Sequence, residues 1–357
     1  MSALDALLRA AAERGGSELH LSPGAAPRLR VAGDLEVLGG HDPLDGGALA
    51  ALLRPLAGAS RWESLERDGD VELVIQVPGV GRHRVSLFLQ EDGVGAVLRR
   101  LPDTAPEAAA LGLSPAVTGL AALSRGLVLV SGPPGSGRSA TLAALVAEID
   151  RTSERHVVFL ARPLEHEIPE SRCSISHREV GEHTADFASG VRAAVRQDAE
   201  VVVVDELGDR AVLEEALTAA ERGLLVLGAR PGVGAARTLD RLLDTFSEGE
   251  QPALRERLAG ALAAVVSQLL VPGADGRGPV AVREVLLRTP DLAAAIREGS
   301  TALVDALIQA GRGQGMQSLD DALLAAVQQG AVDPRDAFLR ARDRSRLETL
   351  LAAHARS

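Results

Sequence analysis

The sequence predicts an α/β fold, with a parallel sheet covered by helices and a smaller α+β domain before it. Short apolar segments alternate with helical patterns over residues 126–229, which is typical of a parallel sheet with helices on both faces. The stretch "SGPPGSGRSAT", residues 131–141, follows the first of these segments and nearly matches the phosphate-loop pattern G-x-x-x-x-G-K-[ST]. Shorter alternating strands and glycine turns precede this region.

The composition excludes several classes of protein. A net charge of −11 and 2% aromatic residues argue against a basic, stacking groove for nucleic acid. The apolar run Leu258–Pro272 is interrupted by Ser267 and Gln268 and is shorter than the roughly 18 residues needed to cross a bilayer. The N-terminus has no basic flank before its apolar residues, unlike a signal peptide. We therefore expect a cytoplasmic protein without membrane insertion. Because Cys173 is the single cysteine and cannot form an internal disulfide, we also expect it to be a free thiol.

The chain contains no lysine, so all 38 basic residues are arginine. This excludes lysine chemistry at every position. It also indicates a mutational bias that converts lysine to arginine. Selection on a working phosphate-binding lysine would be expected to resist this conversion.

The first part, residues 1–102, predicts an α+β domain. An amphipathic helix over 4–14 is followed by short strands over 18–22 and 27–38, a helix over 48–67, and hairpins over 70–101 broken by glycines. The proline-rich stretch 103–115 predicts a linker.

Residues 116–357 predict the second domain. Its apolar strands lie at 126–132, 156–161, 200–206 and 224–229, and its helices at 139–150, 186–197 and 211–223. After Gly232 we expect mostly helix, apart from a strand over 278–287. The part from about residue 250 is therefore predicted to be a helical annex.

A glycine loop between a strand and a helix offers backbone amides and a helix N-terminus to a polyphosphate. The residues expected to bind the nucleotide are Gly132, Pro133, Pro134, Gly135, Ser136, Gly137, Arg138, Ser139 and Ala140. Ser139 is placed to hold Mg²⁺ through its hydroxyl. Arg138 stands where the pattern has lysine, and its broad, planar guanidinium cannot reproduce a compact ammonium. We expect weakened or displaced triphosphate binding, and a larger loss at the transition state.

A pair of acids follows the third apolar strand in "EVVVVDELGD". Asp205 is expected to orient Mg²⁺ through water, and Glu206 to polarise the attacking water. The alternative is a buried strand that ends in a solvated acidic turn.

Several segments in order along the chain resemble the PilT-type pilus retraction ATPases of the secretion-ATPase superfamily. They are "GGSELHLSPGAAPRLRVAGDLEVL", "GRHRVSLFLQEDGVGAVLRRLP", "RGLVLVSGPPGSGRSATLAALV", "ALTAAERG", "RTLDRLLDTF" and "GQGMQSLDDALL". The resemblance implies a PAS-like N-terminal domain and a RecA-like motor domain that binds ATP and Mg²⁺. It also implies a hexameric ring that docks on a pilus platform protein of the inner membrane.

When the functional residues of the family are matched one by one to positions of this sequence, the resemblance implies an altered site. The family's acidic box, Glu-Asp-Pro, whose glutamate is the expected general base, corresponds to Ala161 and Arg162 followed by proline. Pro231 stands where the family has the histidine of Gly-Thr-Leu-His-Thr, and Asp205 replaces a glycine. Arg82, Arg84 and Arg99 match N-domain arginines that approach the nucleotide in the family, so they are candidates for action in trans; the alternative for each is a solvated strand face.

Two hypotheses follow and both stay open here. In the first, the chain binds ATP, has weakened or lost hydrolysis, and is a regulatory or structural subunit of a homo-hexamer or of a mixed ring with an active PilT-type paralogue. In the second, it is an active retraction motor in which Asp205 holds the metal and Glu206 activates water. A ring with a vestigial loop and no ligand is a third possibility.

Overall fold

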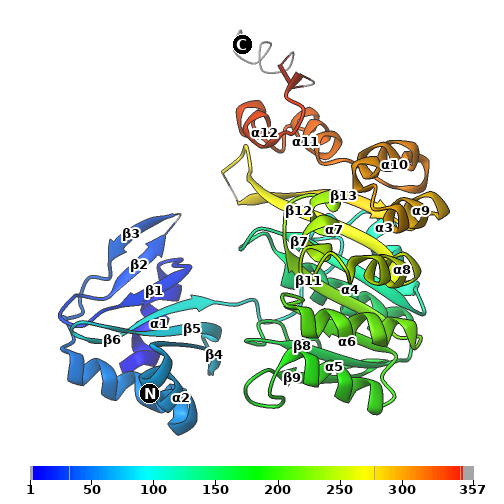
Figure 1. Cartoon of the computed structure of the whole chain (residues 1–357). Coiled ribbons are helices and arrows are strands. Elements are labelled where there is room, and N and C mark those ends of the chain that lie inside the picture. The colour runs from blue at the N-terminus through cyan, green and yellow to red at the C-terminus, as the bar shows by residue number, and fades with distance from the viewer. Residues whose placement is uncertain (1–2, 32, 277, 346, 349–357) are drawn as a thin grey trace. The chain divides into compact units, whose positions relative to one another are not determined.

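The computed structural model describes residues 3–31, 33–276, 278–345 and 347–348, which form two compact units (Figure 1). The first unit contains the residues up to Thr104 and also the segment Arg162–Glu167. The second contains Ala105–Ala161 and the chain from Ile168 onward. Within these described ranges, no helix combines the length and the hydrophobicity that crossing a bilayer requires.

The first unit is built on an antiparallel sheet with the strand order β3-β2-β1-β6-β5-β4. Its strands are β1 (Glu18–Leu21), β2 (Arg28–Val31), β3 (Asp34–Val37), β4 (Asp70–Val77), β5 (Gly81–Gln90) and β6 (Gly93–Arg100). Helices α1 (Ala3–Glu13) and α2 (Gly46–Asp68) contribute leucines to its core, and α2 is kinked at Gly58, whose φ is 69°. The helices and hairpins predicted for this region are confirmed.

The second unit is built on a mostly parallel sheet with the order β13-β12-β7-β11-β10-β8-β9. Its strands are β7 (Gly126–Gly132), β8 (His156–Ala161), β9 (Ser174–Glu179), β10 (Val201–Val204), β11 (Leu225–Pro231), β12 (Leu262–Pro272) and β13 (Pro279–Leu287). Only the β12–β13 pair runs antiparallel among these described strands. The predicted α/β class, with a smaller α+β part before a parallel sheet, is confirmed.

The helices of the second unit alternate with its strands as far as β12, and further helices follow β13 (Figure 1). They are α3 (Pro115–Thr118), α4 (Arg138–Thr152), α5 (Phe187–Arg196), α6 (Arg210–Glu221), α7 (Ala235–Leu243), α8 (Gln251–Ala261), α9 (Pro290–Glu298), α10 (Val304–Ala310), α11 (Leu319–Gln328) and α12 (Pro334–Arg340). Three short 3₁₀ turns, η1 (Gly119–Ala122), η2 (Thr301–Leu303) and η3 (Arg312–Gln314), join some of them.

The prediction of a helical annex from about residue 250 is wrong for residues 262–272, which form β12. A short buried apolar run has no periodicity that separates helix from strand, so its length and its neighbours decide. Here Val265 and Val266 are fully buried, and β12 is paired with β7 on one side and β13 on the other. The run therefore extends the sheet on the side of the glycine loop. The sequence analysis also missed β9, a mostly polar strand at the opposite edge.

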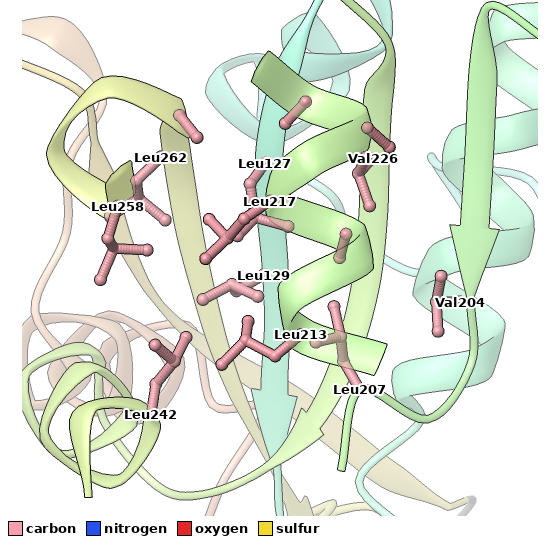
Figure 2. Packing of buried hydrophobic residues seen from close by; sticks show 14 of the residues in the cluster. Leu127, Leu129, Val204, Leu207, Leu213, Leu217, Val226, Leu242, Leu258 and Leu262 are labelled. Carbon is pink, nitrogen blue, oxygen red and sulfur yellow. The ribbon is translucent and has the colours of Figure 1, made fainter. Parts of the chain in front are cut away.

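A large apolar core holds the sheet of the second unit against its helices (Figure 2). Leu213 and Leu217 of α6 lie beside Leu127 and Leu129 of β7, and all four are fully buried. Burying a leucine side chain stabilises a fold by about 1.5–3 kcal/mol. This core fixes β7 and its parallel neighbours, and the carboxyl ends of such strands are where ligand-binding loops gather in open α/β sheets.

Candidate functional site

The glycine loop lies between the end of β7 and the start of α4. Gly135 and Gly137 have φ values of 75° and 85°, in the left-handed region that glycine adopts without strain. At Gly132 a Cβ would come within 2.2 Å of the Ser136 hydroxyl oxygen and 2.5 Å of the Gln268 carbonyl oxygen, so this position has no room for a side chain. The loop delivers its backbone to the N-terminus of a 15-residue helix, where anions are stabilised.

The structure brings Ser139 and Asp205 together. The Ser139 hydroxyl donates a hydrogen bond of 3.1 Å to Oδ2 of Asp205. The turn that carries Asp205 is fixed by backbone bonds on both sides, from the Asp205 amide to Leu160 and from the Leu207 amide to Ala229. Hydroxyl and carboxylate oxygens are ligands that Mg²⁺ prefers, so this donor pair fits the cation, and these two residues would hold it.

Arg138 is the first residue of α4 and is half-buried. Burial lowers the pKa of its guanidinium, and the negative charges of Asp205 and Glu206 act in the opposite direction. The positive charge at this position therefore has two acids in its surroundings. Glu206 itself is exposed.

Positions 161 and 162, at the end of β8, hold no acidic residue, and position 231, at the end of β11, holds no histidine. Ala161 is buried at the end of β8, Arg162 is exposed, and Pro231 is exposed at the end of β11. The neighbouring Arg230 is 5% exposed and donates hydrogen bonds to the carbonyls of Leu207, at 2.7 Å, and Arg241, at 3.0 Å. Burial, with a smaller effect of Arg241, lowers the pKa of Arg230. Arg230 thus ties β11 to the turn that follows the acid pair, a role the sequence analysis missed.

The three predicted N-domain arginines belong to the first unit. Arg82 is 5% exposed and donates to the carbonyls of Leu164 and Glu165, both at 2.8 Å. Arg84 forms ion pairs with Glu72 and Glu165. Arg82 and Arg84 therefore bind the segment Arg162–Glu167, which groups with this unit.

Arg99 is exposed on β6, opposite Arg84 of β5. Of the three arginines, Arg99 is the one whose setting matches the solvated strand face considered as an alternative.

The sequence analysis also missed two buried polar residues on β12 and β13. Gln268 and Arg283 are 1% and 7% exposed, and Gln268 contacts the glycine loop directly. The available clue was the pair of polar residues, Ser267 and Gln268, inside an otherwise apolar run. That clue was used only to exclude a membrane helix.

Comparison with protein families and curated proteins gives consistent results. The family model described as type II/IV secretion system protein matches residues 2–338. The type IV pilus retraction ATPase PilT of Pseudomonas aeruginosa is 36% identical over 331 residues, which cover 93% of this chain and 96% of that protein. The pilus ATPase PilU of the same organism is 32% identical over 94% of this chain and 87% of its own length.

Solved structures agree with these relatives. The crystal structure of the pilus retraction motor PilT with bound ADP has a TM-score of 0.87 and 33% identity, covering 98% of this chain and 99% of that one. The Legionella pneumophila ATPase DotB has a TM-score of 0.82 and 26% identity, covering 94% of both chains. The similarity therefore extends over both units.

Proposed function

This chain belongs to the type II/IV secretion system protein family, and we propose that it is a PilT-like subunit of a type IV pilus machine with weakened or lost ATP hydrolysis. It binds ATP with Mg²⁺ at residues 132–140 and serves pilus retraction and twitching motility as a regulatory or structural subunit. The observation that carries this proposal is the combination of an intact glycine loop with Arg138 in the place of its lysine.

Nucleotide binding is supported by the loop and by its likeness to a structure that holds ADP. The strand, the loop with its two left-handed glycines, and the N-terminus of α4 form an anion site. Ser139 and Asp205 are close enough to share one cation. Bound Mg²⁺ would offset the charge of the terminal phosphates, with Ser139 and Asp205 as its protein ligands.

Weak hydrolysis is supported by the loss of three groups: the loop lysine, the general base and the histidine. Arg138 keeps a positive charge but cannot place it as a lysine does. Ala161 and Arg162 stand where the resemblance implies the general base, and Pro231 stands where it implies a histidine. Electrostatic and acid–base contributions of this kind each supply about tenfold or more to a rate. Their joint absence predicts slow turnover.

The second candidate function is an active retraction motor, and the Ser139–Asp205 contact favours it. In this reading Asp205 holds the metal and the exposed Glu206 orients the attacking water, so the acid pair replaces the missing box. The two candidates share the same fold and loop; they differ in the rate of hydrolysis and therefore in the role of the subunit, regulatory or structural in the first and motor in the second.

A steady-state ATPase assay of the purified protein separates them, with Glu206→Gln as the matched variant. We expect turnover well below about 1 s⁻¹, the low end for ordinary enzymes. Turnover at or above that rate, abolished in Glu206→Gln, establishes the active motor instead. Arg138→Lys should tighten ATP binding in either case, since a compact charge fits the loop better. A loop that binds no nucleotide before or after this change is vestigial.

The proposal includes a ring and a partner. We propose a homo-hexamer, or a mixed ring with an active PilT-type paralogue, that docks from the cytoplasm on a platform protein of the inner membrane. Native mass spectrometry of the protein alone, and after mixing with such a paralogue, distinguishes the two ring compositions.

A further inference from the structure

Two polar side chains are buried beside the glycine loop, on the two strands that extend the sheet past β7. Gln268 of β12 and Arg283 of β13 are directly opposite each other in the antiparallel register, so their side chains share one face of the sheet. They are 1% and 7% exposed. A buried polar group destabilises a fold unless it is hydrogen-bonded, so their hydrogen-bond partners indicate their role.

Gln268 is bonded both to the loop and to the first turns of α4, the helix that follows it. Its Nε2 donates to the carbonyl of Ser136 at 2.7 Å, and its Oε1 accepts from the Thr141 hydroxyl at 2.8 Å. Nε of Arg283 approaches the same oxygen at 3.4 Å. Because arginine has only donors, the amide oxygen must face Arg283 and the amide nitrogen must face the loop. The chemistry of the neighbours thus fixes the orientation of the Gln268 amide.

The bond to Ser136 sets the direction of a loop amide. In a trans peptide the C=O and the N–H point in opposite directions across one plane. The Ser136 carbonyl is directed at Gln268, so the N–H of Gly137 is directed away from Gln268. Gly137 has a φ of 85°, and a Cβ there would lie 3.4 Å from the Gln268 Nε2. The left-handed backbone at this position favours glycine, while the distance to Gln268 is an ordinary van der Waals contact.

We propose that Gln268, with Arg283 behind it, is a positioning residue that holds the Ser136–Gly137 peptide so that the Gly137 amide is presented to a bound phosphate. This inference rests on the proposed nucleotide binding of the loop and assigns a residue outside the loop to it. Gln268 acts through the backbone and does not itself contact the phosphate.

Arg283 strengthens this arrangement. Burial lowers its pKa to about 10, so it stays charged at neutral pH. Its hydrogen bonds are the one to Gln268 and one of 3.4 Å to the Gly112 carbonyl, and no carboxylate within the described part of the chain forms an ion pair with it. A charge that is not neutralised in a medium of low dielectric polarises the groups it contacts. Arg283 therefore makes the Gln268 amide a better donor to Ser136.

The test compares three single variants of the full chain. Gln268→Met keeps the approximate shape of the side chain and removes its hydrogen bonds to Ser136, Thr141 and Arg283. Gln268→Glu keeps an acceptor for Thr141 and Arg283 but replaces the donor to Ser136, and it remains informative if the methionine variant fails to fold. Ser267→Ala is the control, since it removes a buried bond on the same strand, from the Gly234 amide at 2.7 Å, that does not involve the loop.

The first measurement is hydrogen–deuterium exchange of the loop peptide, residues 131–141, without nucleotide. We expect exchange about tenfold faster in both Gln268 variants and unchanged in Ser267→Ala. Only the Gln268 variants remove the hydrogen bond that holds the Ser136–Gly137 peptide. The second measurement is the affinity for a fluorescent ADP, expected to fall about tenfold in the same two variants.

Loop exchange at the native rate in both Gln268 variants overturns the inference. If the native protein binds no ADP while loop exchange still rises, the proposed nucleotide binding fails and the structural part of the inference stands. An equal loss of affinity in Ser267→Ala would show a general effect of instability and would also overturn it.

Discussion

At the scale of single residues, Asp150 shows how one carboxylate stabilises a turn remote from the loop. It lies in α4 and is 5% exposed. Its Oδ1 accepts from the amides of Ser171, Arg172 and Cys173 at 3.1, 3.0 and 2.8 Å, and its Oδ2 accepts from the Ser171 hydroxyl. Burial alone would raise the pKa of Asp150, but these hydrogen bonds outweigh burial and lower it. The folded protein therefore favours the ionised form.

This shift fixes the sign of a pH effect. A carboxyl whose pKa is lower in the folded state stabilises the fold above its unfolded value of about 3.9, and this contribution is lost as the pH falls through the folded value. We expect Asp150→Asn to lower the free energy of unfolding by about 1–2 kcal/mol at neutral pH. Urea unfolding of the native protein and the variant as a function of pH measures this difference in the free energy of unfolding.

The same series contains its control. The stability gap between the native protein and Asp150→Asn should narrow as the pH falls below about 4, because protonation removes the charge that the variant lacks. Asp150→Ala, which leaves three amides without their acceptor, should be less stable than Asp150→Asn at every pH. A gap that is constant with pH contradicts the assigned pKa shift.

At the scale of elements, Glu284 of β13 holds the N-termini of two helices. It is fully buried, and its Oε1 accepts from the Ala235 amide of α7 at 2.5 Å while its Oε2 accepts from the Leu319 amide of α11 at 3.3 Å. Arg342 forms an ion pair with it at 3.1 Å. A negative charge at a helix N-terminus is stabilised by the free amides there. One residue thus fastens α7 and α11 to the sheet.

We expect Glu284→Ala to lower the free energy of unfolding by about 2–4 kcal/mol, since it leaves two helix N-termini and a cation without their partner. Glu256→Ala is the matched comparison, because Glu256 pairs with Arg297 on the surface with 66% of its side chain exposed. Such a pair contributes about 1 kcal/mol or less. Chemical denaturation of both variants tests this; equal losses would mean that Glu284 has no special capping role.

Elements with strong local patterns were predictable from the sequence. The run at 201–204 has four valines before an acidic turn, and the run at 126–132 ends in a glycine loop, so length, composition and flanking residues all indicate buried strands. For the run at 262–272, length, composition and flanking residues do not together indicate a buried strand. Its place in the sheet depends on pairing with β7 and β13, which are distant in sequence. Local composition cannot determine that pairing.

The candidate site divides in the same way. Its loop and its acid pair are contiguous motifs, so their residues could be named in advance. Ser139 meets Asp205 because the segments that carry them follow the carboxyl ends of β7 and β10, two parallel strands with only β11 between them. Gln268 and Arg230 act through backbone carbonyls, at Ser136 and Leu207. A carbonyl acceptor has no residue identity, so no spacing in the sequence indicates such a contact.

At the scale of the whole molecule, the two units have separate apolar cores. The core of the first includes Leu53 of α2, and the core of the second includes Leu217 of α6; both leucines are fully buried. A unit with its own core can unfold as a cooperative body of its own. We therefore expect two transitions in calorimetry. Leu53→Ala should lower the temperature of the first unit's transition, and Leu217→Ala that of the second unit's transition. Each substitution is expected to destabilise its unit by about 2–5 kcal/mol.

This separation gives a thermal test of where the nucleotide binds. All loop residues from Gly132 to Ala140 belong to the second unit. A ligand that binds only the folded form stabilises it by about 2.7 kcal/mol at a concentration of one hundred times its Kd. We expect ADP with Mg²⁺ to raise the transition that Leu217→Ala lowers and to leave the transition that Leu53→Ala lowers in place. A rise confined to the other transition would assign the nucleotide to the first unit and remove the basis for the proposed site.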